Sequence, residues 1–118
     1  MARPTRLTRV NERERRLALN EALFRQVNER INEVADTLGL DTLDIVCECD
    51  MIDCNERIEI THKAYEELRR DATLYAVVPG HDAPPVESVV AHEKRYDVVR
   101  KHEGEPAAVA RATDPRAA

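Results

Sequence analysis

The sequence predicts an α+β fold, in which a long N-terminal helix packs on a small, mainly antiparallel sheet with one short helix and a Cys3His zinc site. Three observations lead to this prediction. Residues 11–38 form an uninterrupted stretch of helical periodicity, and short segments of β-type composition separated by turn residues follow it. All three cysteines of the chain fall between residues 47 and 54, which indicates a metal site.

Length and composition are those of one small domain. The chain has 118 residues, of which 42% are hydrophobic and only 3% aromatic, so we expect a modest aliphatic core that a metal ion would reinforce. The net charge of −5 argues against a surface that binds phosphates throughout.

No apolar run approaches the roughly 20 residues that span a bilayer, so we expect a cytoplasmic protein without membrane contact. In that reducing compartment, clustered cysteines are typical of metal binding or redox chemistry rather than of disulfides.

Both ends of the chain differ in composition from its middle. Residues 1–10 carry three arginines, one proline and few apolar side chains, which predicts a flexible basic arm. Residues 103–118 are rich in Ala, Pro and Arg without periodicity, which predicts a disordered tail. The predicted zinc-binding domain is therefore residues 11–102.

The long helix is expected to begin at Asn11 and to end at Leu38. Asn11 and Glu14 have the spacing of an N-cap and an N3 carboxylate, and Gly39 is placed to end the helix. Around the one polar position at Asn20, apolar residues follow a heptad register: Leu17, Phe24, Val27, Ile31, Val34 and Leu38.

This apolar seam has two interpretations. A heptad repeat with one Asn is typical of a coiled coil, so a homodimer through helix 11–38 is one alternative. However, Leu19, Leu23 and Ala35 widen the seam, as in a helix that packs on its own domain. We favour this second interpretation.

The remaining elements follow from short-range patterns. Leu43, Ile45, Cys47 and Cys49 occupy every second position, which predicts a strand with both thiols on its buried face and Glu48 on the opposite face. The other expected elements are a turn at 50–55, a returning strand at 57–60, a helix at 61–71 capped by Thr61, a strand at 74–78, and a hairpin of strands 86–91 and 96–100.

The cysteines supply three soft thiolate ligands, Cys47, Cys49 and Cys54, and a tetrahedral Zn²⁺ ion needs a fourth donor. The candidates for that donor are His62, His81, His92, His102, Asp50 and Asp53. We favour His81, because it follows a predicted buried strand at a Pro-Gly turn, where a side chain can be aimed without disrupting a helix. His62 is the second choice.

The spacing Cys-x-Cys-x4-Cys leaves other chemistries open. A thiol redox switch, an iron–sulfur cluster or plain reduced cysteines would also account for it. Catalytic zinc is disfavoured, because Glu48 is predicted to face away from the thiols and no other acid or base is marked out. The glycines match no phosphate-binding pattern, and no nucleophile elbow is present, so we predict that the chain is not an enzyme.

Several short motifs together resemble a known family. They are Cys47-Glu48-Cys49, Cys54, Glu56-Arg57-Ile58, Tyr65-Glu66 and Val78-Pro79-Gly80-His81, with the helix at 11–31. Over residues 10–102 the chain is similar to a family of small, uncharacterised zinc-binding proteins of high-GC Gram-positive bacteria. The resemblance implies no reaction, substrate or partner, but it adds weight to His81 as the fourth ligand. Met51-Ile52 is more apolar than the turn expected from that resemblance.

The sequence favours a non-catalytic role. We expect a regulatory or protein-interaction module, stabilised by structural zinc, that binds a protein partner through the long helix or a sheet edge. The segment 41–59 holds seven acidic residues against Arg57 as its one base, which suits a basic partner. Two alternatives are a nucleic-acid-binding or ribosome-associated factor that uses the basic N-terminal arm, and a zinc-thiolate redox sensor.

Overall fold

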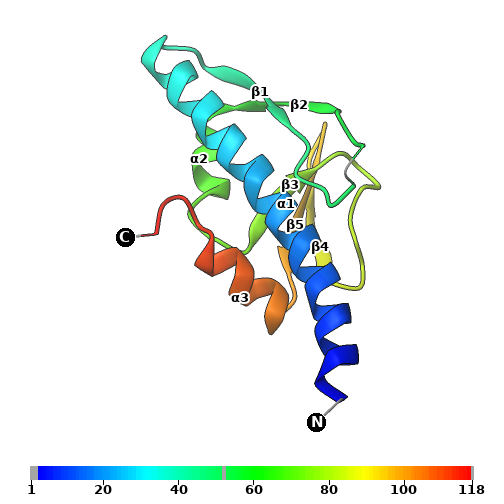
Figure 1. Cartoon of the computed structure of the whole chain (residues 1–118). Coiled ribbons are helices and arrows are strands. Elements are labelled where there is room, and N and C mark those ends of the chain that lie inside the picture. Colours follow the sequence, from blue (N-terminus) through cyan, green and yellow to red (C-terminus); the bar gives the residue numbers. More distant parts are fainter. Residues whose placement is uncertain (1–2, 52, 118) are drawn as a thin grey trace.

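The computed structural model describes residues 3–51 and 53–117, and for residues 3–15 it describes the backbone alone. Over these residues it confirms the α+β class, with three helices and two small antiparallel sheets (Figure 1). The helices are α1 (Arg3–Thr37), α2 (His62–Leu68) and α3 (Glu105–Ala112). The strands are β1 (Thr42–Val46), β2 (Arg57–Thr61), β3 (Leu74–Val77), β4 (Glu87–His92) and β5 (Asp97–Lys101).

The strands form two sheets, whereas the sequence predicted one. β1 pairs with β2, with Thr42 opposite Thr61 at one end and Val46 opposite Arg57 at the other. β3, β5 and β4 form a second antiparallel sheet in that order. β1 ends at Val46, because the chain then departs into the cysteine loop. Beyond that point the Glu48 N–H donates to the Ala76 carbonyl (2.9 Å) and so links the loop to β3.

Short-range patterns predicted the elements between residues 57 and 101 well. β2, α2, β3 and the β4–β5 hairpin all lie within one to three residues of their expected bounds. Thr61 caps α2 as expected, since its hydroxyl accepts the Ala64 N–H at 3.0 Å. Tyr65 and Leu68 on the predicted inner face of α2 are buried.

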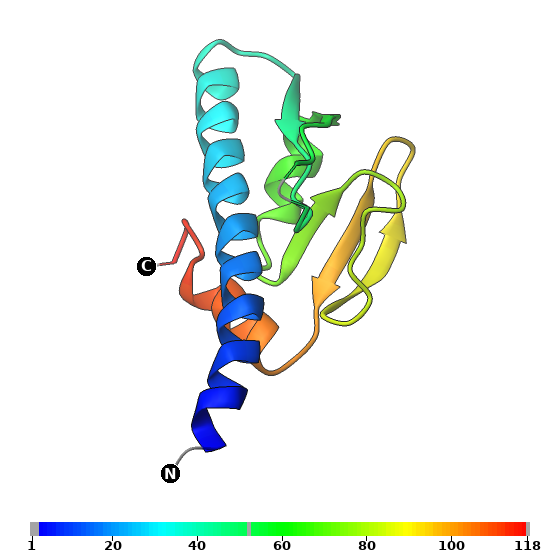
Figure 2. The same cartoon turned by 45° about the vertical axis from the view of Figure 1, so that its right-hand side comes forward.

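The N-terminal helix starts earlier than predicted. α1 begins at Arg3 rather than Asn11, so residues 3–10 continue the helix instead of forming the predicted flexible arm. Pro4 does not prevent this, because a proline in the first turn of a helix removes no hydrogen bond that the helix would make. The N-terminal end of α1 extends beyond α3 and the sheets (Figure 2). At the other end, α1 stops at Thr37 and Gly39 adopts a φ of 72°, close to the predicted stop.

The buried face of α1 is largely polar, and this corrects most of the predicted apolar seam, although Ala35 is buried and Ile31 packs against the core as predicted. Glu21, Arg25, Asn28 and Asn32 are buried along it. The Arg25 guanidinium, for example, donates to the carbonyl oxygens of residues 72 and 110 at 2.7 and 2.8 Å and stacks on the Tyr75 ring. The helix packs against backbone carbonyl groups that, among the described residues, have no partner within their own helix or strand. Polar side chains on this face of α1 donate hydrogen bonds to these carbonyl groups. Several seam residues lie instead on the exposed side: Leu19, Leu23, Val27, Val34 and Leu38.

The C-terminal segment is ordered and packs on the domain, whereas the sequence predicted a disordered tail. α3 buries Ala107 and Ala110, and its carbonyl at residue 110 receives the Arg25 hydrogen bond. Beyond it, the Arg116 guanidinium contacts carboxylates of Glu29 on α1 and Glu66 on α2 at 2.6 to 3.0 Å. The sequence did not predict this helix, because its buried residues are alanines, which contribute little to a hydrophobic periodicity. The ion pairs that attach the C-terminal segment join residues far apart along the chain.

The core lies between α1, α2 and the two sheets. Its largest fully buried apolar side chains are Ile45, Ile58, Tyr65, Tyr75, Val77 and Val99. Cys47 and Cys49 belong to the same cluster, so the core and the predicted metal site are continuous. None of the helices in the described part of the chain is long and apolar enough to cross a membrane.

Candidate metal centre

A loop at the end of β1 carries the three cysteines. The Cys47 N–H donates to the Glu56 carbonyl at 3.0 Å, which extends the β1–β2 pairing by one step. The loop then turns back, and the Cys54 N–H donates to the Met51 carbonyl at 3.0 Å. Because the two strands are antiparallel, this loop brings Cys54 back to the end at which Cys47 leaves the sheet.

The turn after β3 carries the histidine. Gly80 has a φ of 90°, which a residue with a Cβ rarely adopts, and the His81 N–H donates to the Val78 carbonyl at 2.9 Å. The Val78 N–H in turn donates to the Cys47 sulfur at 3.1 Å. The backbone before the turn is thus bonded directly to a cysteine of the other sheet, and this fixes where His81 lies.

The four side chains meet in one small volume. The sulfur atoms of Cys47, Cys49 and Cys54 and a ring nitrogen of His81 all lie within 4.8 Å of one another. His81 Nδ1 is 3.7 Å from the Cys47 sulfur and 3.6 Å from the Cys54 sulfur. A tetrahedral ion with ordinary zinc–sulfur and zinc–nitrogen bond lengths would set sulfur and nitrogen about 3.6 Å apart. The group therefore has the size and donor set of a four-ligand metal site.

Burial makes the thiols costly to ionise on their own. Cys47 and Cys49 are fully buried, and this burial raises the pKa of Cys47 far above its ordinary value and that of Cys49 to about 11. The N–H of Val78 acts in the opposite direction by stabilising the Cys47 thiolate. A metal ion binds thiolates, so its binding here must displace protons and must supply the positive charge that the site otherwise lacks.

Glu48 is buried, whereas strand alternation between the two cysteines had predicted that it lies on the opposite, solvent-facing side of the strand. Because β1 ends at Val46, the strand alternation stops before Glu48, and its side chain is fully buried. One carboxylate oxygen accepts from Arg69 Nη2 (2.6 Å) and from the Ala76 N–H (2.9 Å), and the other accepts from Asn28 Nδ2 (2.8 Å). Glu48 thus ties the cysteine loop to α1, to the end of α2 and to β3.

Asn28 completes this support from α1. Its side-chain amide pairs with the backbone of Val46, because Nδ2 donates to the Val46 carbonyl and Oδ1 accepts the Val46 N–H, both at 2.8 Å. The residue immediately before Cys47 is therefore held on both backbone groups. No pattern in the sequence pointed to Asn28 or Arg69, since their partners lie 18 to 21 residues away along the chain.

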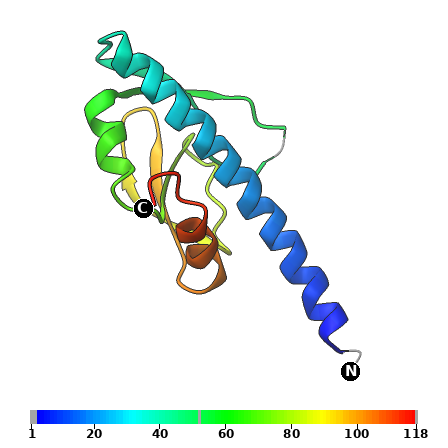
Figure 3. The ribbon, with the colours of Figure 1, turned by 60° about the vertical axis from the view of Figure 1, so that its left-hand side comes forward.

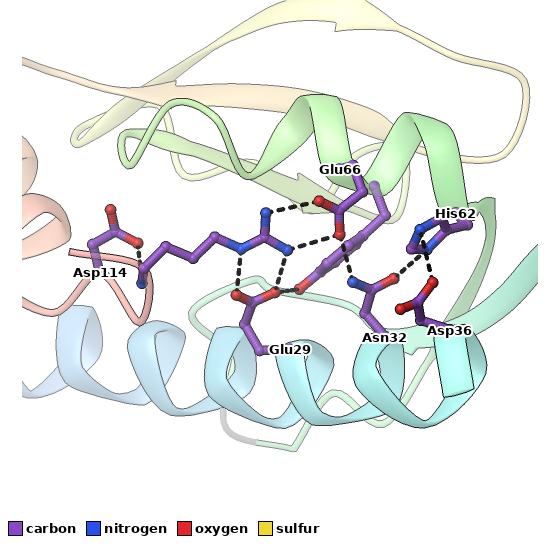
Figure 4. Close-up of polar contacts among 8 residues, drawn as sticks. Glu29, Asn32, Asp36, His62, Glu66 and Asp114 are labelled. Atoms are coloured by element: carbon purple, nitrogen blue, oxygen red, sulfur yellow. Dashed lines mark hydrogen bonds and ion pairs between the residues drawn. The ribbon is translucent and has the colours of Figure 1, made fainter. Parts of the chain in front are cut away.

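The other candidate ligands lie outside this group, so far as residues 3–51 and 53–117 show. His62 Nδ1 is 2.8 Å from Asn32 Oδ1, and its Nε2 is 3.6 Å from Asp36, within a polar network that also holds Glu66 (Figure 4). His92 contacts the Asp97 carboxylate, and His102 contacts the Ser88 hydroxyl, both at 2.9 Å. Asp50 and Asp53 are likewise not among the grouped side chains.

The four grouped side chains supply as many donor atoms as a tetrahedral metal ion takes. Both oxygens of Glu48, the acidic residue between two of the cysteines, accept hydrogen bonds from the protein. Comparison with protein-family models, with curated protein sequences and with solved structures gave no significant match.

Proposed function

We propose that this chain is a non-catalytic zinc protein, in which Zn²⁺ bound by Cys47, Cys49, Cys54 and His81 stabilises a small protein-interaction module. The observation that carries the proposal is the grouping of three thiols from the β1–β2 loop and one imidazole from the turn after β3 within 4.8 Å. Zinc would join the β1–β2 loop to the turn after β3, and it would strengthen a core that is short of aromatic residues.

The donor set supports zinc over other metals. Thiolate and imidazole are ligands that Zn²⁺ binds in structural Cys₃His sites, whereas Ca²⁺ and Mg²⁺ prefer oxygen donors. Iron–sulfur clusters generally use four thiolates, and the chain has three cysteines. Four protein ligands leave no open position for a substrate or water, which supports a structural role rather than a catalytic one.

Metal content is the test. Native mass spectrometry of the wild type, His81→Ala and His62→Ala would count metal ions per chain, and thermal melting would be followed before and after treatment with a chelator. We expect one zinc ion in the wild type and in His62→Ala, weakened zinc retention in His81→Ala, and a large drop in melting temperature on chelation. A metal-free wild type that melts unchanged in chelator would refute the proposal, and iron in place of zinc would refute the choice of metal.

A second candidate function, nucleic-acid binding, is favoured by the early start of α1. Arginines recur every three or four residues at the N-terminal end, which is the repeat of the helix found there: Arg3, Arg6, Arg9, Arg13 and Arg16. A helix rich in arginine that extends beyond the rest of the domain suits electrostatic contact with a phosphate backbone (Figure 3). Such binding should weaken steeply with salt, so the affinity for a short RNA duplex, measured between low and moderate salt, decides this alternative. Affinity that does not change with salt would exclude it.

A further inference from the structure

The outer side of α1 carries an apolar stripe that nothing in the described chain covers. We define this stripe by five side chains that are 41 to 66% exposed: Leu19, Leu23, Val27, Val34 and Leu38. At about 100° per residue, Leu23 and Val34 lie roughly 160 to 180° around the helix from the buried Arg25. In Figure 3, α1 crosses in front of the other elements. Apart from the buried Ala22 and Ala35, the helix therefore buries mainly polar side chains and exposes large apolar ones, unlike an ordinary surface helix.

We propose that the apolar stripe binds the same stripe of a second copy of this chain in an antiparallel two-fold dimer. This inference rests on the proposed role as an interaction module, for which it names the partner, but it does not depend on which metal the site binds. The spacing of the stripe supports an antiparallel arrangement. If Leu19 lies opposite Leu38 of the second copy, then Leu23 lies opposite Val34, and a two-fold axis passes between residues 27 and 30. Every apolar residue of the stripe except Val27 then meets another one.

The charges of α1 support the same direction. The exposed Arg16 would lie beyond the C-terminal end of the second copy's α1, where the chain turns into the acidic segment 41–59. A parallel pairing would instead set Arg16 against Arg16 and Arg30 against Arg30 across the axis. Arg30, whose side chain is 82% exposed, can cover the partner's Val27 in the antiparallel dimer with its aliphatic part while its guanidinium stays in solvent.

The surface beside α1 can accept the partner helix. A groove of about 670 Å³ runs between the C-terminal half of α1 and the β1–β2 sheet. Its lining is apolar on the helix side and partly polar on the sheet side: Ile31, Val34, Leu40 and Leu43 are joined by Asp44, Arg57 and Glu59. It is continuous with the apolar stripe at Val34. In the antiparallel register, Leu19 and Leu23 of the second copy would lie over this end of α1 and could enter the groove.

Two double variants test both the dimer and its direction. Leu23→Glu with Val34→Glu places like charges opposite each other in either direction, so we expect a monomer. Leu23→Glu with Val34→Lys places opposite charges together only in the antiparallel register, so we expect a dimer at low salt. Val90→Glu is the matched control, because Val90 is 47% exposed but lies on β4, away from α1. This control should remain dimeric.

Light scattering during size-exclusion chromatography at about 100 μM protein gives the mass, with twice the 13.4 kDa of one chain expected for the wild type. A monomeric wild type overturns the proposal, as does a dimeric Leu23→Glu/Val34→Glu variant. A monomeric Leu23→Glu/Val34→Lys variant overturns the antiparallel direction. Circular dichroism and zinc content on the same samples separate the two proposals: a zinc-loaded monomer contradicts the dimer alone, and a metal-free dimer contradicts the zinc site alone.

Discussion

Replacing Glu48 with glutamine should destabilise the protein strongly, although it changes a carboxylate to an amide of nearly the same shape. The Glu48 carboxylate is fully buried and pairs with the Arg69 guanidinium, whose side chain is only 2% exposed. Nε and Nη1 of Arg69 are buried without a hydrogen-bond partner among the described residues, so Glu48 provides most of the compensation for this charge. Removing one member of a buried ion pair costs about 3–5 kcal/mol, because the remaining charge is left unpaired.

That cost is large against the total stability of a small domain, about 5–15 kcal/mol. At about 4 °C per kcal/mol for a domain of this size, Glu48→Gln should lower the melting temperature by roughly 10–20 °C. Zinc affinity should also fall, by about 10- to 100-fold, because Glu48 holds the backbone between Cys47 and Cys49. Differential scanning calorimetry and competition with a zinc chelator measure the two effects.

A matched control and a compensating variant make this prediction specific. Glu59→Gln removes an exposed carboxylate from β2 and should change the melting temperature by only a degree or two. Glu48→Gln combined with Arg69→Met should recover much of the lost stability, since it removes the unpaired charge. If Glu48→Gln melts within a degree or two of Glu59→Gln, the buried ion pair does not stabilise the fold as its geometry indicates.

Three further perturbations have defined outcomes. Burial raises the pKa of Glu21 to about 8, so the stability that protonated Glu21 contributes should be fully present below its ordinary pKa of about 4.5 and should be lost as the pH rises through about 8. Urea titrations across this range should show a flatter profile for Glu21→Gln. Arg116→Ala removes the contacts of the C-terminal segment with two carboxylates, so hydrogen exchange should accelerate in α3 first, with a small change in melting temperature. Gly80→Ala places a Cβ at a φ of 90° and should cost about 1–2 kcal/mol in calorimetry, and it should also weaken zinc binding, because this turn aims His81.

The parts of the structure that the sequence predicted depend on neighbours close along the chain. Strand alternation, the Thr61 cap and the Pro-Gly turn placed β2, α2 and β3, and the same turn pointed to His81 as the residue beside the thiols. Glu48 was misplaced because alternation was carried beyond the end of β1, and only long-range partners show that the strand stops at Val46.

The inner face of α1 was misassigned for a related reason. A helical pattern shows which residues share one side of the helix. Which side is buried depends on whether the neighbouring elements present apolar side chains or polar groups that need hydrogen-bond partners. Here the neighbouring elements present carbonyl groups and a buried carboxylate, so Arg25 and Asn28 point inward and Leu23 points outward. The C-terminal helix was missed because its inner residues are alanines, whose burial contributes little to a periodic signal.

The polar inner face of α1 also determines how the helix can move. Apolar contacts between a helix and a sheet are interchangeable, so such a helix can slide or rotate while it repacks. A shift of α1 by one turn, about 5.4 Å, would instead leave the backbone of Val46 and the guanidinium of Arg25 without partners, at about 1–3 kcal/mol for each group. These hydrogen bonds therefore oppose both translation and rotation of α1. Through Asn28 they also connect the position of α1 to the residue next to Cys47, so a displacement of the helix would disturb the cysteine loop.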